Sequence, residues 1–288
     1  MTSTVWVIAG DGIRSRSNEV PSCFILSEYL PMKLKIIGKK FRRWWLRNSS
    51  RVHLERWNKD FAKLVKKDEY VLDAGAGRAP YRHLFSLAHY ETADFEMVDK
   101  KYHPSTYVCD LKSIPVEDER FHYIVFNQVM EHLPDPLTVL REFRRILKPE
   151  GKLICTCPLF YAEHEEPFDF YRYTQFGHRY LFDQAELEIE SLDWMEGYFG
   201  TIGYQMESVY KDIPLNPAKF PMGIPGYIAV PILVAVKYAS FILAGLFYRL
   251  DIRFRYTASG MPKNYVVIAR KIVTHDAEVL TNETVAPP

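Results

Sequence analysis

The fold class of this chain is decided by the stretch Val71-Leu72-Asp73-Ala74-Gly75-Ala76-Gly77. A short apolar run leads directly into a Gly-x-Gly turn, and residues 81–87 then resume a helical pattern. Glycines at a strand-to-helix turn let the backbone approach a bound ligand closely. Taken alone, this turn fits either a dinucleotide site or a purely structural turn.

Strand-like and helix-like runs alternate along the rest of the chain. The pattern predicts helices at 136–147 and 174–185, the first with Asp135 as N-cap and Pro136 at the first helical position. It predicts strands at 69–73, 90–95, 105–110, 122–127, 152–157, 187–194 and 264–271. This alternation predicts an α/β protein with a Rossmann-like, doubly wound sheet of seven strands, which we expect to be parallel.

Three acidic residues stand at the ends of the first three predicted strands. Asp73 ends the first, Asp94 follows 21 residues later at the end of the second, and Asp110 ends the third. In this position Asp94 can accept ribose hydroxyls, Asp110 an exocyclic amine of adenine, and Asp73 can hold the amino-acid end of a cofactor. Leu111 would pack on the adenine ring. Any one of these aspartates fits a cap or loop role, but three successive strand ends indicate a nucleoside site.

These residues carry a family resemblance. Residues 71–85, Asp94, Asp110, 127–133 and 140–151 resemble class I S-adenosylmethionine-dependent methyltransferases of the small-molecule type. The resemblance covers about 69–196 and the strand at 264–271. It implies S-adenosyl-L-methionine as the cofactor, held by Asp73, Gly75, Gly77, Asp94, Asp110, Leu111 and Asn127. Ala79-Pro80 replaces the commoner third glycine of the loop.

A second segment resembles a narrower group. Residues 164–174 look like a subgroup of bacterial methyltransferases that is associated with surface-glycan biosynthesis. The implied reaction is methyl transfer to a small or lipid-linked acceptor, first of all O-methylation of a saccharide. The alternative is a quinone or isoprenoid-lipid methyltransferase, and a different class is a catalytically silent, cofactor-binding membrane adaptor.

Two histidines are the candidate catalytic residues. Methyl transfer needs alignment and exclusion of water, and an oxygen acceptor of high pKa also benefits from a general base. His132 follows the fourth predicted strand and His164 the fifth, both at the edge of the sheet where open α/β folds bind ligands. Tyr171 and Arg172 are candidates for the acceptor pocket. Structural loop packing is the alternative for each histidine, and an ion pair with Asp169 is the alternative for Arg172.

The sequence argues against a metal and against nucleic acid. Metal-dependent methylation needs a carboxylate cluster at the same edge, whereas the fourth predicted strand ends in the neutral Asn127. The net charge of +1 does not favour a nucleic-acid partner, and the signature of base-methylating enzymes is absent after the fourth strand. We therefore expect no metal and no nucleic acid.

Outside the sheet, the sequence divides into an arm, an insertion and two extensions. We expect a disordered extension at 1–31, a basic helical arm at 32–68, the catalytic domain at 69–200 with 263–273, a hydrophobic insertion at 201–262, and a disordered tail at 274–288. Residues 33–67 contain thirteen Lys or Arg against two acidic residues. Few, mostly strand-borne cysteines and the lack of a signal peptide predict a cytoplasmic protein.

The insertion carries a strongly apolar run. Residues 224–248 contain Lys237 as their only charge, and Pro225 and Pro231 are expected to break the first part. Length alone allows a membrane span. However, a single span would place the sixth and seventh strands on opposite sides of the bilayer. We therefore expect a packed helical insertion or an interfacial helix, with peripheral attachment to the inner face of the cell membrane. A contact between two copies of the chain is the alternative.

Overall fold

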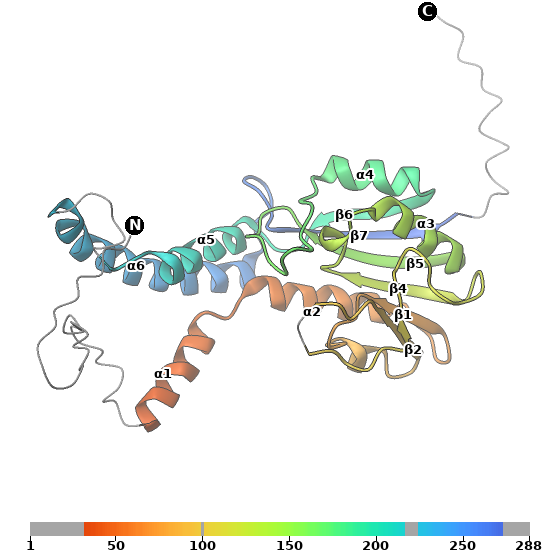
Figure 1. Ribbon diagram of the computed structural model, residues 1–288, viewed down its shortest axis with the longest axis horizontal. Coiled ribbons are helices and arrows are strands. Elements are labelled where there is room, and N and C mark those ends of the chain that lie inside the picture. Colours follow the sequence, from red (N-terminus) through yellow and green to blue (C-terminus); the bar gives the residue numbers. More distant parts are fainter. Residues whose placement is uncertain (1–31, 99–100, 217–223, 273–288) are drawn as a thin grey trace, which may run out of the picture. The chain divides into compact units, whose positions relative to one another are not determined.

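The computed structural model describes residues 32–98, 101–216 and 224–272 of the 288-residue chain (Figure 1). The expected extensions at 1–31 and 274–288 lie outside these residues. Two compact units are present, divided after Trp45. The first contains helix α1 (Met32–Trp45). The second begins at Leu46, so helix α2 (Ser49–Ala62) belongs with the sheet although the predicted arm ran to residue 68.

The second unit is built on a seven-stranded sheet with helices on both faces. The strand order is β3-β2-β1-β4-β5-β7-β6. The strands are β1 (Tyr70–Ala74), β2 (His89–Asp94), β3 (Tyr107–Val108), β4 (Phe121–Asn127), β5 (Leu147–Pro158), β6 (Leu187–Trp194) and β7 (Asn264–Lys271). The helices are η1 (Arg82–Phe85), η2 (Met130–His132), α3 (Pro136–Ile146), α4 (Gln175–Gln184), α5 (Tyr198–Asp212) and α6 (Ile224–Phe254).

Side chains alternate between two cores along β1, β4, β5 and β7. In β1, Leu72 joins the larger core, which contains Phe143 of α3 and Phe182 of α4. Its neighbour Val71 joins the smaller core, with Phe61 of α2. Strands buried on both faces are what a doubly wound sheet requires, so the predicted α/β fold is confirmed.

The sheet is mixed, which corrects the expectation that all its strands are parallel. β7 lies between β5 and β6 and runs antiparallel to both. The reason is topological. β6 ends at the carboxyl edge, and the chain then passes through α5 and α6 before it enters β7 at that same edge. A strand that starts there must run in the opposite direction.

Helices α5 and α6 lie side by side in a hairpin (Figure 1). Tyr248 of α6 donates a hydrogen bond of 2.5 Å to Glu207 of α5, and its ring packs where Gly203 leaves room. The predicted break was wrong, because α6 is one helix of 31 residues that includes Pro231. Pro225 falls in the first helical turn, where a missing N–H leaves no hydrogen bond unmade.

The hairpin is anchored at its base by buried polar contacts. Asp251 near the end of α6 is fully buried and accepts a hydrogen bond of 2.8 Å from the backbone N–H of Gly197. Its other oxygen lies 3.3 Å from Nε2 of His53 on α2. These contacts hold the base of the hairpin at the carboxyl edge of the sheet.

Candidate functional site

The glycine turn after β1 is held tightly against the loop after β4. Gly75 has a φ of +72°, and its N–H donates a 2.7 Å hydrogen bond to the carbonyl of Ala93 in β2. A Cβ at this position would lie 2.4 Å from Cγ2 of Val129. Only glycine therefore fits both the backbone angle and the space.

Two of the three predicted acids line one cavity beside this turn. Asp94 is buried and accepts hydrogen bonds from the backbone N–H groups of Gly77, at 2.9 Å, and Glu96, at 3.1 Å. Asp110 is exposed and pairs with Lys112. The cavity between them measures about 280 Å³, and we call it the cofactor cavity. Apolar walls are supplied by Phe95, Leu111, Val129, Leu133 and Phe168.

Asp73 lies outside this lining. It is buried at the end of β1, where the hydroxyl of Tyr90 donates a 2.5 Å hydrogen bond to its carboxylate. Burial, more than offsetting this hydrogen bond, raises the pKa of Asp73 to about 7. A cation close to Asp73 would stabilise the ionised form of this carboxyl group.

A second, polar cavity of about 240 Å³ adjoins the first. Gly75, Gln128, His132 and Glu165 line both cavities. The remaining polar lining residues are Asn48, Ser50, Arg51, Asn127, Tyr161, His164, Lys263 and Asn264. Asn127, predicted as a cofactor residue, therefore faces the polar cavity. Its side chain donates to Asn58 and accepts from Thr156.

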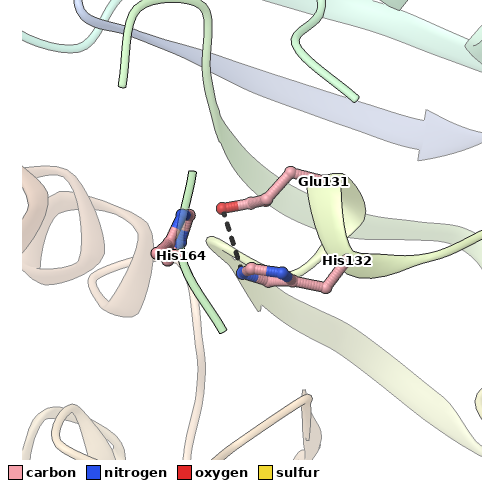
Figure 2. A group of neighbouring side chains, drawn as sticks. All are labelled: Glu131, His132 and His164. Carbon is pink, nitrogen blue, oxygen red and sulfur yellow. Dashed lines mark ion pairs between the residues drawn. The ribbon is translucent and has the colours of Figure 1, made fainter. Parts of the chain in front are cut away.

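The two predicted catalytic histidines meet where the cavities join. The ring centroids of His132 and His164 lie 4.6 Å apart. Beside them lies Glu131, which is fully buried; Figure 2 shows the three side chains directed toward one another. Burial raises the pKa of Glu131 to about 7 and lowers that of His132.

Tyr171 and Arg172 line neither cavity. The Tyr171 hydroxyl donates to the carbonyl of Pro134 at 3.3 Å. Arg172 forms the ion pair with Asp169 that the sequence had left as an alternative, with both nitrogens within 2.8 Å of the carboxylate. Asp169 in turn lies 3.3 Å from Nδ1 of His164, so Arg172 acts on the site through Asp169.

Sequence reasoning missed the polar residues that come from distant segments. Arg51 belongs to α2, and Lys263 and Asn264 stand at the entry to β7. Lys263 is 4% exposed and lies over the rings of Tyr161 and Tyr204. A lysine and an asparagine at the start of a strand do not by themselves indicate a binding site. They reach the cavity only because β7 enters the sheet antiparallel to β5 and β6.

The residues at the cofactor cavity fit S-adenosylmethionine. The apolar walls at Phe95 and Leu111 suit an adenine ring, and Asp94 at the end of β2 suits ribose hydroxyls. At Gly77 a Cβ would have no neighbour within 4 Å among the residues described by the structure, which leaves room beside the turn. A Rossmann-like sheet with this turn defines a nucleoside-cofactor enzyme.

The family follows from comparison with known proteins. A family model described as a methyltransferase domain matches residues 45–190, slightly more than half of the chain. The chain therefore belongs to the methyltransferase domain family, and its cofactor is S-adenosylmethionine.

Similar proteins include two quinone-pathway enzymes by name. The demethylmenaquinone methyltransferase of Chlamydia muridarum is 29% identical over 34% of this chain and 48% of its own length. The ubiquinone biosynthesis O-methyltransferase of Coxiella burnetii is 26% identical over 42% and 54%. The chain thus spans about half the length of the curated relatives it matches. A solved structure of phosphoethanolamine N-methyltransferase 2 from Haemonchus contortus shares 20% identity, covering 72% of this chain and 49% of that one, with a TM-score of 0.42.

The first prediction concerns the glycine turn. Gly75→Val should weaken S-adenosylmethionine binding at least about tenfold in titration calorimetry, because the side chain collides with Val129 and displaces the turn. Gly38→Val is the control, since no atom of the described residues lies within 4 Å of a Cβ placed there. Unchanged affinity in the Gly75 variant would show that the cofactor binds elsewhere.

The second prediction concerns Asp73, the buried acid at the end of β1. Its folded pKa of about 7 exceeds the ordinary value of 3.8, so the folded state holds an extra proton between these values and loses stability as pH rises through them. Asp73→Asn should therefore raise the Tm of the cofactor-free protein at pH 8, by roughly 3 °C or more, and by less at pH 5. It should also weaken cofactor binding.

The exposed Asp183→Asn is the matched control for this second prediction and should change Tm little at either pH. Scanning calorimetry without cofactor makes the measurement. A Tm difference for Asp73→Asn that is equal at pH 5 and pH 8 contradicts the raised pKa.

Proposed function

We propose that this methyltransferase acts on a hydroxyl oxygen of a lipid-linked acceptor, with a quinone-type or isoprenoid lipid as the first candidate. The observation that carries the proposal is the polar cavity joined to the cofactor cavity at His132. S-adenosylmethionine supplies an activated methyl group. The O–CH₃ bond forms as the S–CH₃ bond breaks, S-adenosylhomocysteine leaves, and the hydroxyl proton passes to the protein or to water.

The histidines support loss of that proton. Nδ1 of His132 shares a hydrogen with the carbonyl oxygen of Phe168, which leaves the Nε2 lone pair for the cavity. Burial lowers the pKa of His132, which favours the neutral imidazole near pH 7. His164 contacts the His132 ring and lines the polar cavity. These groups provide a basic side chain at the point where an acceptor meets the cofactor.

The acceptor class rests on two observations of different kind. Relatives named as demethylmenaquinone and ubiquinone-biosynthesis methyltransferases favour a quinone-type lipid. The polar lining at Asn48, Arg51 and Asn264 suits an acceptor with several hydroxyl groups, which keeps O-methylation of a saccharide as the second candidate. Both classes occur as lipid-linked molecules.

Attachment to a membrane would bring such an acceptor to the site. Residues 229–254 of α6 are long and apolar enough to cross a bilayer, yet only 17% of their most apolar window is buried. The residues Ile232, Val236, Ile242, Leu243 and Leu246 form an exposed apolar stripe along this helix. A core helix would bury these side chains, so the stripe supports contact with an apolar phase.

Helix α1 has the composition of a membrane-surface element. Its exposed residues include the cations Lys39, Lys40, Arg42 and Arg43. Phe41 and Trp44 are 52% and 60% exposed. Cations near an anionic membrane contribute about 1 kcal/mol each, and tryptophan favours the headgroup region. We therefore propose peripheral attachment at the cytoplasmic face of the membrane; a homodimer through α6 is the alternative.

The third prediction tests the acceptor. The purified chain with S-adenosylmethionine should release S-adenosylhomocysteine when given a hydroxylated prenylquinone in micelles, and mass spectrometry should find one added CH₂ in the lipid. The double variant His132→Ala/His164→Ala should lose at least about a hundredfold in rate. Methylation of a lipid-linked saccharide but not the quinone would select the second candidate, whereas no turnover with extracted lipids or glycans would favour a silent adaptor.

The fourth prediction tests the membrane contact by liposome flotation. The chain should float with anionic vesicles in high salt, because the apolar stripe does not depend on charge. Ile232→Glu/Ile242→Glu/Leu246→Glu should abolish salt-resistant flotation. Phe176→Glu/Tyr180→Glu, at still more exposed apolar positions on α4, is the control and should float like the parent chain. A parent chain that floats with no vesicle excludes the membrane contact, and its size in solution then tests the dimer.

A further inference from the structure

Glu131, His132 and His164 form a cluster whose donor atoms lie within 4.8 Å of one another (Figure 2). Glu131 and His132 are adjacent in η2, and His164 comes from the loop between β5 and α4. The Glu131 side chain is fully buried. Among the residues that the structure describes, none donates a hydrogen bond to its Oε1 atom. A buried carboxylate oxygen without a partner is costly, which indicates that a ligand belongs there.

Both imidazoles are fixed through the same ring nitrogen. Nδ1 of His132 contacts the carbonyl oxygen of Phe168. Nδ1 of His164 lies 3.2 Å from the carbonyl oxygen of Ala162 and 3.3 Å from Oδ2 of Asp169. These acceptors hold the hydrogen on Nδ1 and leave the Nε2 lone pair as the available donor in each ring. Metal-binding histidines are oriented in this way by carbonyl and carboxylate partners.

The partners of the cluster are themselves held in place. Both terminal guanidinium nitrogens of Arg172 donate hydrogen bonds to Asp169, at 2.7 and 2.8 Å. Arg172 thereby holds the carboxylate that lies beside Nδ1 of His164. The second oxygen of Glu131, Oε2, accepts a hydrogen bond of 3.5 Å from the thiol of Cys157. Within the described part of the chain, Oε1 of Glu131 is left without a hydrogen-bond partner.

We propose that Glu131, His132 and His164 bind one divalent transition-metal cation. Two imidazole nitrogens and one carboxylate oxygen suit Zn²⁺, Mn²⁺ or Fe²⁺ rather than Mg²⁺ or Ca²⁺, which prefer oxygen donors alone. Our expectation of no metal considered only Asn127 at the end of β4. The donors instead lie four and five residues further along and in another loop.

The cluster needs only a small adjustment to close around a cation. Nε2 of His132 lies 3.8 Å from Oε1 of Glu131. Bonds of about 2.1 Å place neighbouring donors roughly 3.0–3.5 Å apart. Donor atoms that lie within 4.8 Å of one another need to move inward only slightly to bind a common cation.

The position of the cation gives it a role in the proposed reaction. His132 lines both cavities, so the cation would stand where the acceptor hydroxyl approaches the cofactor. A bound divalent cation lowers the pKa of a coordinated hydroxyl, which promotes loss of its proton. This role rests on the proposed function. The two histidines would then act as ligands, and the proton would leave to water or to Glu165 at the same junction.

The fifth prediction tests metal binding independently of turnover. The untagged 288-residue chain, treated with a chelator and dialysed, should bind one equivalent of Zn²⁺ in calorimetry. Bound Co²⁺ should show the visible absorption bands expected when nitrogen atoms coordinate it. Glu131→Gln, His132→Ala and His164→Ala should each weaken Zn²⁺ binding at least about tenfold. Exposed His83→Ala is the matched control and should bind Zn²⁺ like the parent chain. Retained S-adenosylmethionine binding shows that each variant is folded.

The outcomes separate this inference from the proposed function. No Zn²⁺, Mn²⁺ or Co²⁺ binding, or binding unchanged in all three ligand variants, overturns the metal site whatever the acceptor. Metal binding without methylation of any lipid acceptor keeps the site and rejects the proposed function. Methylation of the lipid that survives chelation and does not rise on adding metal overturns the catalytic role of the cation.

Discussion

The close contact between Gly75 and Val129 joins the first and fourth strand-end loops, and the rest of the site depends on it. No side chain fits between them, because a Cβ on Gly75 would overlap the Val129 methyl groups. Val129 immediately precedes η2, the short helix that carries Glu131 and His132. The turn that shapes the cofactor cavity therefore also sets the position of the groups at the cavity junction.

The chain leaves the sheet after β6 and returns at the same edge before β7, and this determines part of the lining of the polar cavity. Because α5 and α6 start and end at the carboxyl edge, β7 enters the sheet antiparallel and carries Lys263 and Asn264 into the polar cavity. The same hairpin presents the exposed apolar stripe. Buried Asp251 ties its base to α2 and to the start of α5. The exposed apolar stripe and two lining residues of the polar cavity are thus positioned by the same hairpin.

The buried acidic residues near the site differ in how well their negative charge is compensated by neighbouring groups. Asp73 and Glu131 are both buried acids whose pKa is raised to about 7. Asp169, by contrast, is kept ionised by Arg172. Positive charge brought near Asp73 or Glu131 would relieve the desolvation of either carboxylate. Under our proposals, a metal cation would do so at Glu131. Asp169 needs no such ligand and serves to orient His164.

The sequence by itself determined the strand-to-helix turn and the seven strands, because hydrophobic periodicity and glycine geometry are local properties. The cofactor came from the resemblance of these motifs to class I methyltransferases. β6 and β7 were predicted with their observed bounds. Local pattern also placed His132 and His164 at the ligand-binding edge. Only the tertiary structure decided the direction of β7, the continuity of α6 through Pro231 and the meeting of Glu131 with both histidines. These features depend on where the chain re-enters the sheet and on contacts between residues far apart in sequence, which no local pattern encodes.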